Sequence, residues 1–423
     1  MTPFHTHTLI TRIDERISEI FLVVYLLFLP LKPELSIVAF IVTIAYFLFT
    51  NKFKRSYVAW KCQTGINIML AFYLLHVAGM LYSANIDYGL RDLQTKLSFI
   101  LFPIVLSGIG LTVMTFEKIK NATIVSAIIS LMILLVVSFM QYLNSHDKTV
   151  FFYTHLSHGK HVTYLAIFMN LALLFLIEKI YNRKSKLPSI LYLLAFIFLF
   201  SGILLLSART ATLVAILTTS LFPFFIPSRK INLHINWIIH ACCLAFSILF
   251  FLGYLHLFNR FNQVEEAIAI RGSQSNSAEV QKENPNSTNI RFNIWTNTLQ
   301  LIRRNPLFGV GTGDLKEELV KVYAENGYEY GVKERPSPHN QFLHTAVILG
   351  IPGLVALTLL LFFPLVTAFR QEEWLFFFFL VVVFLNSMTE SILEREAGIL
   401  FFTAFSSCFY LLRPQKQPFT TET

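Results

Sequence analysis

The sequence predicts an all-α, polytopic membrane protein with about 12 transmembrane helices. Hydrophobic residues make up 55% of its 423 residues, 43 of which are Phe, and only 14% are charged. Soluble domains usually carry about a quarter charged residues, so this chain has too little polar surface to remain in water. Apolar runs recur along most of the sequence, and basic residues gather in short clusters between them, as they do in membrane proteins.

The apolar runs define the predicted spans, because a helix crosses a bilayer with about 20 apolar residues. The first two runs are short and the seventh and eighth are nearly continuous, so we expect about 10 to 12 spans. The runs cover residues 17–31, 35–50, 65–82, 95–113, 122–143, 160–178, 188–206, 210–227, 234–257, 342–368, 373–389 and 396–412.

The distribution of Lys and Arg predicts the topology. Basic residues are more frequent in the segments on the N-terminal side of the membrane than in the short loops on the other side. By the positive-inside rule, both termini are cytoplasmic and the number of spans is even. Arg12 and Arg16 precede the first run, but no small-residue cleavage pattern follows, so we interpret this run as a span and not as a cleavable signal.

Three parts follow along the chain. Residues 1–258 are predicted to form an N-terminal transmembrane bundle of about nine spans. Residues 259–341 form a large polar loop on the outer face, between spans 9 and 10. Residues 342–423 form a C-terminal bundle of about three spans with a cytoplasmic tail.

The second half of the polar loop shows signals of regular structure. Apolar residues at helical spacing predict a helix over 290–304, which Asn305-Pro306 ends. The glycines of GVGTGD predict a tight turn, because no strand precedes them as a dinucleotide site requires. Asp314 with Glu317 then predicts a capping box at the start of a second helix, and a glycine at position 327 predicts its end.

Charge and cysteine content exclude some functions. The net charge of +9 does not indicate nucleic-acid binding, because the basic residues form no single stripe; it suits anionic lipid or a phosphate-bearing substrate. The four cysteines show neither a disulfide framework nor metal-ligand spacing. They are Cys62, Cys242, Cys243 and Cys408.

Three basic side chains on the outer face are candidates for chemistry. Arg209 in SARTATL begins a span, Arg291 in RFNIW begins the loop helix, and His339 in RPSPHNQFL begins the tenth span. A guanidinium fork suits phosphate oxygens, and a neutral imidazole suits a general base. Structural roles also fit: a membrane anchor for Arg209, stacking of Arg291 on Trp295 one turn away, and a helix cap for His339 with Asn340.

Other polar residues lie near the same boundary. Glu390 and Glu394 follow the eleventh span, where they would either hold one of the arginines or face water. His158 and His161 have no acidic partner at ligand spacing, so metal binding is not predicted for them.

Together, these motifs resemble the O-antigen ligase and polymerase superfamily. The resemblance is carried by SARTATL, RFNIWTNTLQLIRRNPLFGVGTGD and SPHNQFLHTAVILGIPGLVAL, in this order, within about residues 207–355. YGLRDLQTKLSFILFPIVL and YTHLSHGKHVTYLAI look like the family's earlier outer-face segments. The second of these departs from the family pattern, because no proline stands near its second His.

The resemblance implies a GT-C-like membrane glycosyltransferase of the bacterial inner membrane, with an active site that faces the periplasm. Family members take a glycan from undecaprenyl diphosphate, and ligases transfer it to a sugar hydroxyl of the lipid A core in lipopolysaccharide biosynthesis. By position, Arg209 and Arg291 match the arginines that hold the diphosphate, and His339 matches the histidine that activates the acceptor. No metal, other cofactor or nucleic acid is expected. The substrate-binding set is Arg91, Lys96, His158, His161, Trp295, Asn340 and Glu390.

Three functions remain to be weighed. A ligase is favoured, and a polymerase of O-antigen or exopolysaccharide repeat units is the alternative, because both would use the same donor. A lipid-glycan transporter is disfavoured, since transporters place charges near the membrane midplane and the candidates here cluster at the outer boundary. The enzyme interpretation predicts that Arg209, Arg291 and His339 converge on one outer cavity.

Overall fold

The computed structural model describes residues 19–61, 63–159, 161–181, 188–226 and 287–412, and the single positions 17, 241 and 248. Most of these residues form helices and short 3-10 turns, and no strand occurs among them, which confirms the all-α prediction for this part of the chain. Nearly all of the predicted ninth span and the first part of the predicted loop lie outside the described residues.

Two groups of helices flank the long undescribed segment. The first group is α2 (Pro33–Phe49), α3 (Phe53–Trp60), α4 (Thr64–Gly79), α5 (Ile86–Lys96), α6 (Ser98–Ile109), α7 (Val113–Ser145), α8 (Tyr153–Ser157), α9 (Val162–Tyr181), α10 (Ser189–Leu206) and α11 (Arg209–Leu221). The second group is α13 (Ser287–Arg304), α14 (Leu315–Glu325), α15 (Glu329–Glu334), α16 (Gln341–Arg370), α17 (Trp374–Ser387) and α18 (Glu396–Leu412). The 3-10 turns are η1 (Met80–Tyr82), η2 (Lys148–Phe151), η3 (Phe222–Phe225) and η4 (Ile392–Glu394).

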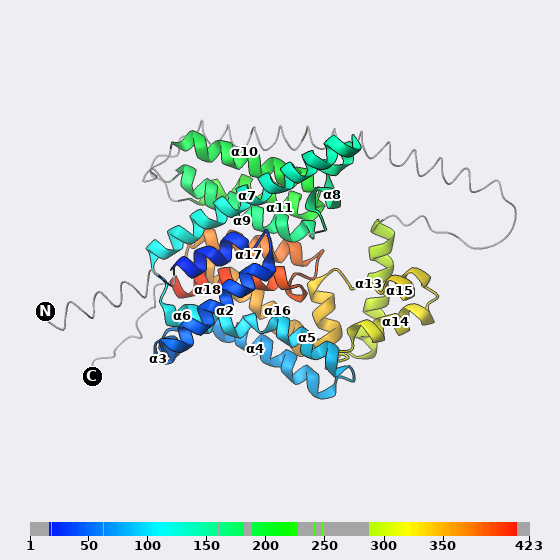
Figure 1. The fold of residues 1–423 in the computed structure, drawn as a ribbon. Coiled ribbons are helices and arrows are strands. Elements are labelled where there is room, and N and C mark those ends of the chain that lie inside the picture. The colour runs from blue at the N-terminus through cyan, green and yellow to red at the C-terminus, as the bar shows by residue number, and fades with distance from the viewer. Residues whose placement is uncertain are drawn as a thin grey trace, which may run out of the picture.

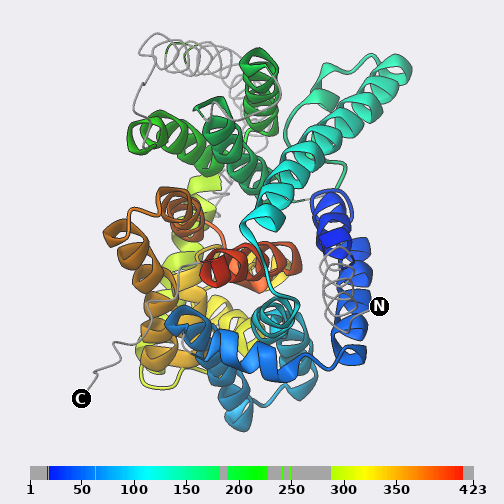
Figure 2. The ribbon, with the colours of Figure 1, turned by 90° about the vertical axis from the view of Figure 1, so that its left-hand side faces the viewer.

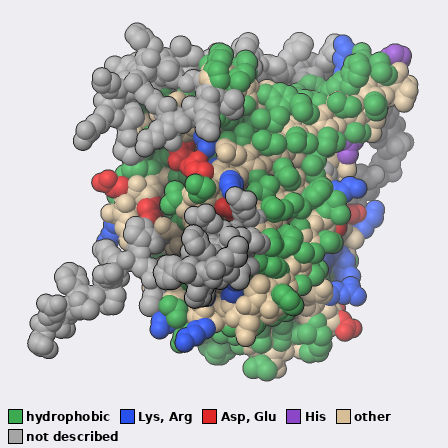
Figure 3. Space-filling view, turned by 60° about the vertical axis from the view of Figure 1, so that its left-hand side comes forward, with side chains coloured by type: hydrophobic (Ala, Val, Ile, Leu, Met, Phe, Trp, Pro, Cys, Tyr) green, Lys and Arg blue, Asp and Glu red, His purple; other side chains and the backbone are tan. Residues whose placement is uncertain are grey.

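Among the described residues, five helical stretches are long and apolar enough to cross a membrane, or six if the bent pair α2 and α3 is one span. Shorter apolar helices accompany them, so a multi-pass arrangement fits, whereas the prediction of about 12 spans and of a loop between spans 9 and 10 is not confirmed. Figure 3 shows a face with a broad band of hydrophobic side chains and charged side chains toward its edges. The five stretches are Thr64–Tyr82, Ile86–Ile109, Val113–Ser145, Val162–Tyr181 and Gln341–Arg370.

The core of the bundle is built around α9 and α18. Almost the whole length of α9 is buried, and α9 packs against α7, α10, α11 and α17. In Figure 2, α18 lies at the centre of the molecule, between the group formed by α7, α10 and α11 and the helices α2 to α6. Phe side chains fill the contact between α17 and α18; the rings of Phe376 and Phe409, for example, stack with centroids 4.7 Å apart.

The helices α13, α14 and α15 gather at one end of the bundle (Figure 1). The predicted helix over 290–304 is confirmed as α13, which ends just before Asn305. Buried residues of α13 and α14 pack against Val347, Ile348 and Leu349 of α16 in a small second core. The second half of the predicted loop is therefore an ordered helical cap on that end of the bundle.

The glycine-rich segment joins this cap to a break in α16. Gly350 interrupts the helical dihedral angles of α16, with φ 59° and ψ −147°, and so leaves carbonyls of the preceding turn without helical partners. The amides of Val310 and Gly311 donate to the carbonyls of Val347 and Ile348 at 2.8 and 3.0 Å. The predicted turn is therefore also a backbone clamp on α16.

The predicted helix start at Asp314 is confirmed, since Asp314 is the N-cap of α14, but the predicted capping box is wrong. The Asp314 side chain makes no cap hydrogen bond to α14, and its carboxylate instead accepts from the amides of Ala84 and Asn85, both at 2.7 Å. Glu317 accepts from the Asn85 side chain at 2.7 Å. Asn85 caps α5, so Asp314 satisfies backbone amides at the start of another helix, and both carboxylates tie the cap to α5. Gly327, with φ 64°, follows the end of α14 as predicted.

We expect Gly309→Ala to destabilise the protein more than Gly327→Ala. Both glycines have positive φ, which costs a non-glycine residue about 1 kcal/mol. A Cβ on Gly309 would lie 2.3 Å from the carbonyl oxygen of Val347, whereas a Cβ on Gly327 meets no atom within 4 Å. The overlap adds about 1–3 kcal/mol. Thermal unfolding of both purified variants measures the difference; equal losses would show that the clamp tolerates a side chain.

Candidate functional site

The segment between α17 and α18 carries a carboxylate that joins two of the predicted site residues. Glu390 is buried, with 8% of its surface exposed. Its Oε1 accepts a hydrogen bond from Nη2 of Arg291 at 3.4 Å, and its Oε2 lies 3.2 Å from Nδ1 of His339. The candidate phosphate-binding arginine of α13 and the candidate base before α16 thus meet at one side chain.

The charge state of Glu390 follows from these neighbours. Burial by itself raises the pKa of a carboxyl group, because it disfavours the charged form. The hydrogen bond and charge of His339, followed by the charges of His161 and Arg291, outweigh this effect and lower the pKa of Glu390 below its ordinary value. Glu390 is therefore a carboxylate at neutral pH.

His339 is held in an unusual backbone conformation before α16. Its φ is 47°, in the left-handed region, which is uncommon for a residue other than glycine. The indole Nε1 of Trp295 donates to the carbonyl of Pro338 at 2.8 Å and so fixes the residue just before it. Trp295 and Arg291, one turn apart on α13, therefore contact Pro338, which precedes His339, and Glu390, which faces its imidazole.

Asn340 performs the capping role that was considered for the His339–Asn340 pair. Its side-chain oxygen accepts from the amides of Phe342 and Leu343 at 2.9 and 3.1 Å. Its Nδ2 donates to the carbonyl of Met388 at 2.9 Å, two residues before Glu390. His339 itself precedes the cap, so the expectation that it begins the span is wrong, since α16 begins at Gln341. Asn340 accepts the hydrogen bonds of the free amides at the start of α16. The imidazole of His339 is therefore not needed as a cap and faces Glu390.

Arg209 is the first residue of α11 and is exposed. The hydroxyl of Thr389 donates to that of Thr210 at 2.9 Å, so the start of α11 lies beside the segment that carries Glu390. This contact brings Arg209 to the same end of the bundle as Arg291 and His339.

The two histidines of the segment before α9 have different surroundings. His161 is half-buried and lies within electrostatic reach of Glu390 and His339. The imidazole of His158 instead lies 3.2 Å from the Ser138 hydroxyl and 3.5 Å from the side-chain nitrogen of Gln141, both on α7. His161 therefore interacts electrostatically with Glu390, whereas the side-chain contacts of His158 are to α7.

Lys96 lies in a separate buried charge network. Its side chain is fully buried, and Nζ lies 2.5 Å from both Asp92 Oδ1 and Glu394 Oε2. Glu394 also lies 3.1 Å from Nε2 of His344, and the charges of His344 and Lys96 outweigh burial and hold the pKa of Glu394 well below its ordinary value. Arg91, on the same helix as Lys96, is exposed.

Gln341 connects this network to the segment that carries Glu390. Its Nε2 donates to Glu394 at 2.8 Å and its Oε1 accepts from the amide of Leu393 at 2.7 Å. Sequence reasoning missed Gln341, His344 and Asp92. A signal was present, since Asp92 and Lys96 stand four residues apart inside an apolar stretch, and charges inside spans are rarely without a role.

The site thus combines a guanidinium, an imidazole and a carboxylate at one end of an apolar bundle. This set can bind an anion and accept a proton, which are the two tasks of a displacement with an anionic leaving group. Among the described residues, no group of three or more His, Cys, Asp and Glu side chains is arranged to hold a metal ion.

The bundle and this site define a multi-pass membrane protein with a polar site at one end. Residues 194–358 match the family model for O-antigen ligase. This match confirms the predicted resemblance to that superfamily of membrane glycosyltransferase-like ligases and polymerases. The match includes Arg209, Arg291 and His339, whereas Glu390 lies beyond it. A comparison with curated proteins finds no match.

Proposed function

We propose that this protein is an inverting, metal-independent O-antigen ligase of the bacterial inner membrane. It would transfer a glycan from undecaprenyl diphosphate to a sugar hydroxyl of lipid A–core at the periplasmic face. The family match supports lipid-linked glycans as the substrate class. The observation that carries the proposal is the pairing of His339 and Arg291 through Glu390.

In this proposal His339 is the general base. With a proton on Nδ1 that faces the Glu390 carboxylate, Nε2 of the imidazole is left as the acceptor for the proton of the sugar hydroxyl. The carboxylate orients the ring and stabilises the imidazolium that forms, as in other His–carboxylate pairs. The hydroxyl oxygen then attacks the anomeric carbon, and the bond to the diphosphate breaks with inversion.

Arg291 and Arg209 would stabilise the diphosphate as it leaves. Guanidinium groups donate two parallel hydrogen bonds to phosphate oxygens, so they match the charge that develops on the leaving group. Arg291 is held by a long contact of 3.4 Å to Glu390, and 42% of its side chain is exposed. The guanidinium therefore retains donors that a diphosphate can reach.

A transfer assay with purified protein tests this function. The donor is a polymer linked to undecaprenyl diphosphate, the acceptor is lipid A–core, and neither nucleotide nor metal is added. We expect transfer in the wild type, and a fall of about 100-fold or more in both Arg291→Ala and His339→Ala. Arg303→Ala is the matched control, because Arg303 lies on the same helix and is exposed. It should retain activity.

The same assay separates ligase from polymerase, which is the alternative within this family. Single repeat units on the lipid replace the polymer, and lipid A–core is left out. Lengthening of the lipid-linked chain, without transfer to the core in the first assay, would identify a polymerase. If folded protein with active donor forms neither product, both functions are contradicted. Transport of the lipid-linked glycan would then be tested next.

A further inference from the structure

The segment 388–394, which carries Glu390 between α17 and α18, is attached at both of its ends to the start of α16. At the first end, the side chain of Asn340 donates to the carbonyl of Met388 at 2.9 Å. At the other end, the side chain of Gln341 forms hydrogen bonds of 2.7 and 2.8 Å with the last two residues of the segment. The position of Glu390 therefore depends on both attachments.

The Gln341 side chain is buried and its amide is fully used. Its exposure is 0%, and its Oε1 accepts from the backbone amide of Leu393. Its Nε2 donates to Glu394 and, at 3.2 Å, to the hydroxyl of Thr345, so both N–H groups have an acceptor. A side chain in this state does not contact a substrate, so its effect on chemistry has to act through the residues that it holds.

Both groups that Gln341 holds are otherwise fixed or in need of a partner. The second carboxylate oxygen of Glu394 lies 2.5 Å from Nζ of Lys96 on α5 and 3.1 Å from Nε2 of His344 on α16. Leu393 lies in the 3-10 turn η4, and the first amides of a helical turn have no partner within it. Gln341 supplies that partner and so ties the turn to α16.

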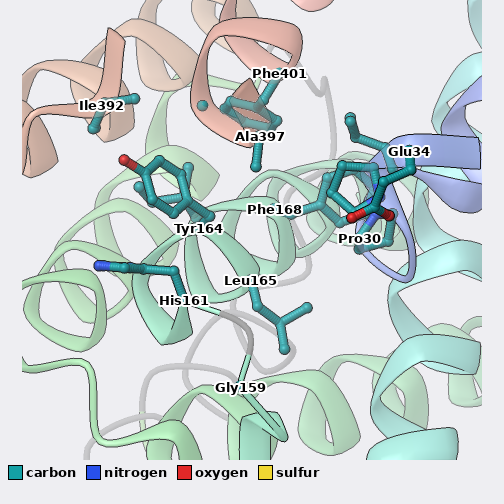
Figure 4. A pocket seen from close by; sticks show the side chains of 14 residues that line it. Pro30, Glu34, Gly159, His161, Tyr164, Leu165, Phe168, Ile392, Ala397 and Phe401 are labelled. Carbon is teal, nitrogen blue, oxygen red and sulfur yellow. The ribbon is translucent and has the colours of Figure 1, made fainter. Parts of the chain in front are cut away.

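A weaker contact reaches the same segment from α9. The hydroxyl of Tyr164 donates to the carbonyl of Ser391 at 3.3 Å, and Figure 4 shows this hydroxyl directed toward the segment that contains Ile392. The bond is longer than either bond of Gln341 to the segment, and hydroxyl bonds of this length are weak. It also comes from outside α16, so it does not set the distance from the start of α16 to Glu390.

We propose that Gln341 is a positioning residue for the glycan transfer. It holds the turn 392–394 so that the carboxylate of Glu390 stays 3.2 Å from Nδ1 of His339. Gln341 lies two residues after His339, and the turn begins two residues after Glu390, so the two contacts connect the same short stretches of chain. This role rests on the proposed function, but the hydrogen bond between imidazole and carboxylate can be observed without substrate.

Nuclear magnetic resonance of the full chain in detergent, with isotope-labelled histidine, tests the geometry. The N–H signal of His339 is identified by its loss in His339→Ala. We expect this signal in the wild type and its loss in Gln341→Met, because an imidazole proton without a carboxylate partner exchanges with water. Methionine has the length of glutamine but no N–H donor. Tyr164→Phe, and Gln371→Met at the exposed far end of α16, are the controls and should keep the signal.

The transfer assay supplies the second readout. We expect Gln341→Met to lower kcat by about 10- to 100-fold with an unchanged KM for the donor, because a small displacement of a catalytic group slows the reaction without weakening binding. Combined with Glu390→Gln, it should be no slower than Glu390→Gln alone, whereas a general loss of structure would lower the rate further. A wild type that shows the histidine signal but no transfer would contradict the proposed function and not the role of Gln341 in the pair.

Thermal unfolding verifies that each variant is folded. If Gln341→Met does not fold, Gln341→Glu replaces it, because it keeps an acceptor for Leu393 but places a second carboxylate where Nε2 lies 2.8 Å from Glu394. Its signal and rate should fall below those of the wild type. A histidine signal absent from the wild type, or a wild-type signal and rate in the folded Gln341 variant, would overturn the proposal.

Discussion

Glu390→Gln is expected to lower the rate of glycan transfer by about 100-fold or more without unfolding the protein. Glutamine keeps the size of the side chain but removes the charge that faces His339 at 3.2 Å and Arg291 at 3.4 Å. Without the carboxylate, the imidazole loses the partner that orients it and stabilises its protonated form. The measurement is the initial rate of transfer, with thermal unfolding of the same preparation as the check on folding.

A double-variant comparison separates this role from an independent one. If Glu390 acts through His339, then Glu390→Gln combined with His339→Ala should be no slower than His339→Ala alone, because residues that act as a unit are not additive. A double variant whose rate falls by the product of the two single-variant factors would show that Glu390 contributes separately from His339. Glu334→Gln, an exposed carboxylate at the end of α15, is the matched control and should leave the rate unchanged.

Lys96→Met is expected to have the largest effect on stability, a loss of about 3–5 kcal/mol in the free energy of unfolding. The substitution removes the cation from a network in which the Lys96 side chain is fully buried. The carboxylates of Asp92 and Glu394 are then left unpaired in an apolar environment, which is far more costly than the loss of an exposed pair.

Thermal unfolding in detergent measures this effect, with Lys321→Met as the control. Lys321 pairs with Glu318 at 2.6 Å but is exposed, so its substitution should change the free energy of unfolding little. The comparison also tests the substrate-binding role that the family resemblance implies for Lys96. A Lys96→Met variant with wild-type stability and no transfer would identify Lys96 as a substrate contact.

The sequence predicted the local elements of the cap well, because their signals are local. Asn305-Pro306 ends α13 and Gly327 follows the end of α14, as expected from turn chemistry. Asp314 shows where this reasoning stops: the nearest free amides in sequence belong to α14, but the carboxylate binds those of Ala84 and Asn85. A capping pattern does not reveal which helix start lies closest in space.

The candidate site was predictable as a set of residue types but not as a set of contacts. Arg291 and His339 stood out because a guanidinium suits phosphate oxygens and a neutral imidazole suits a general base. The choice between Glu390 and Glu394 could not be made from sequence, since both follow the same predicted span. Packing decides it: Glu390 meets His339, and Glu394 meets Lys96 and His344.

The pairing of Glu390 with Arg291 and His339 also has a consequence for biogenesis. The three side chains come from segments that leave the ribosome one after another, and the carboxylate is the last to emerge. A nascent chain inserted only as far as α16 already displays the arginine and the histidine but lacks their shared partner. The contacts of Glu390 with Arg291 and His339 can therefore form only after α17 and the segment that follows it have been synthesised.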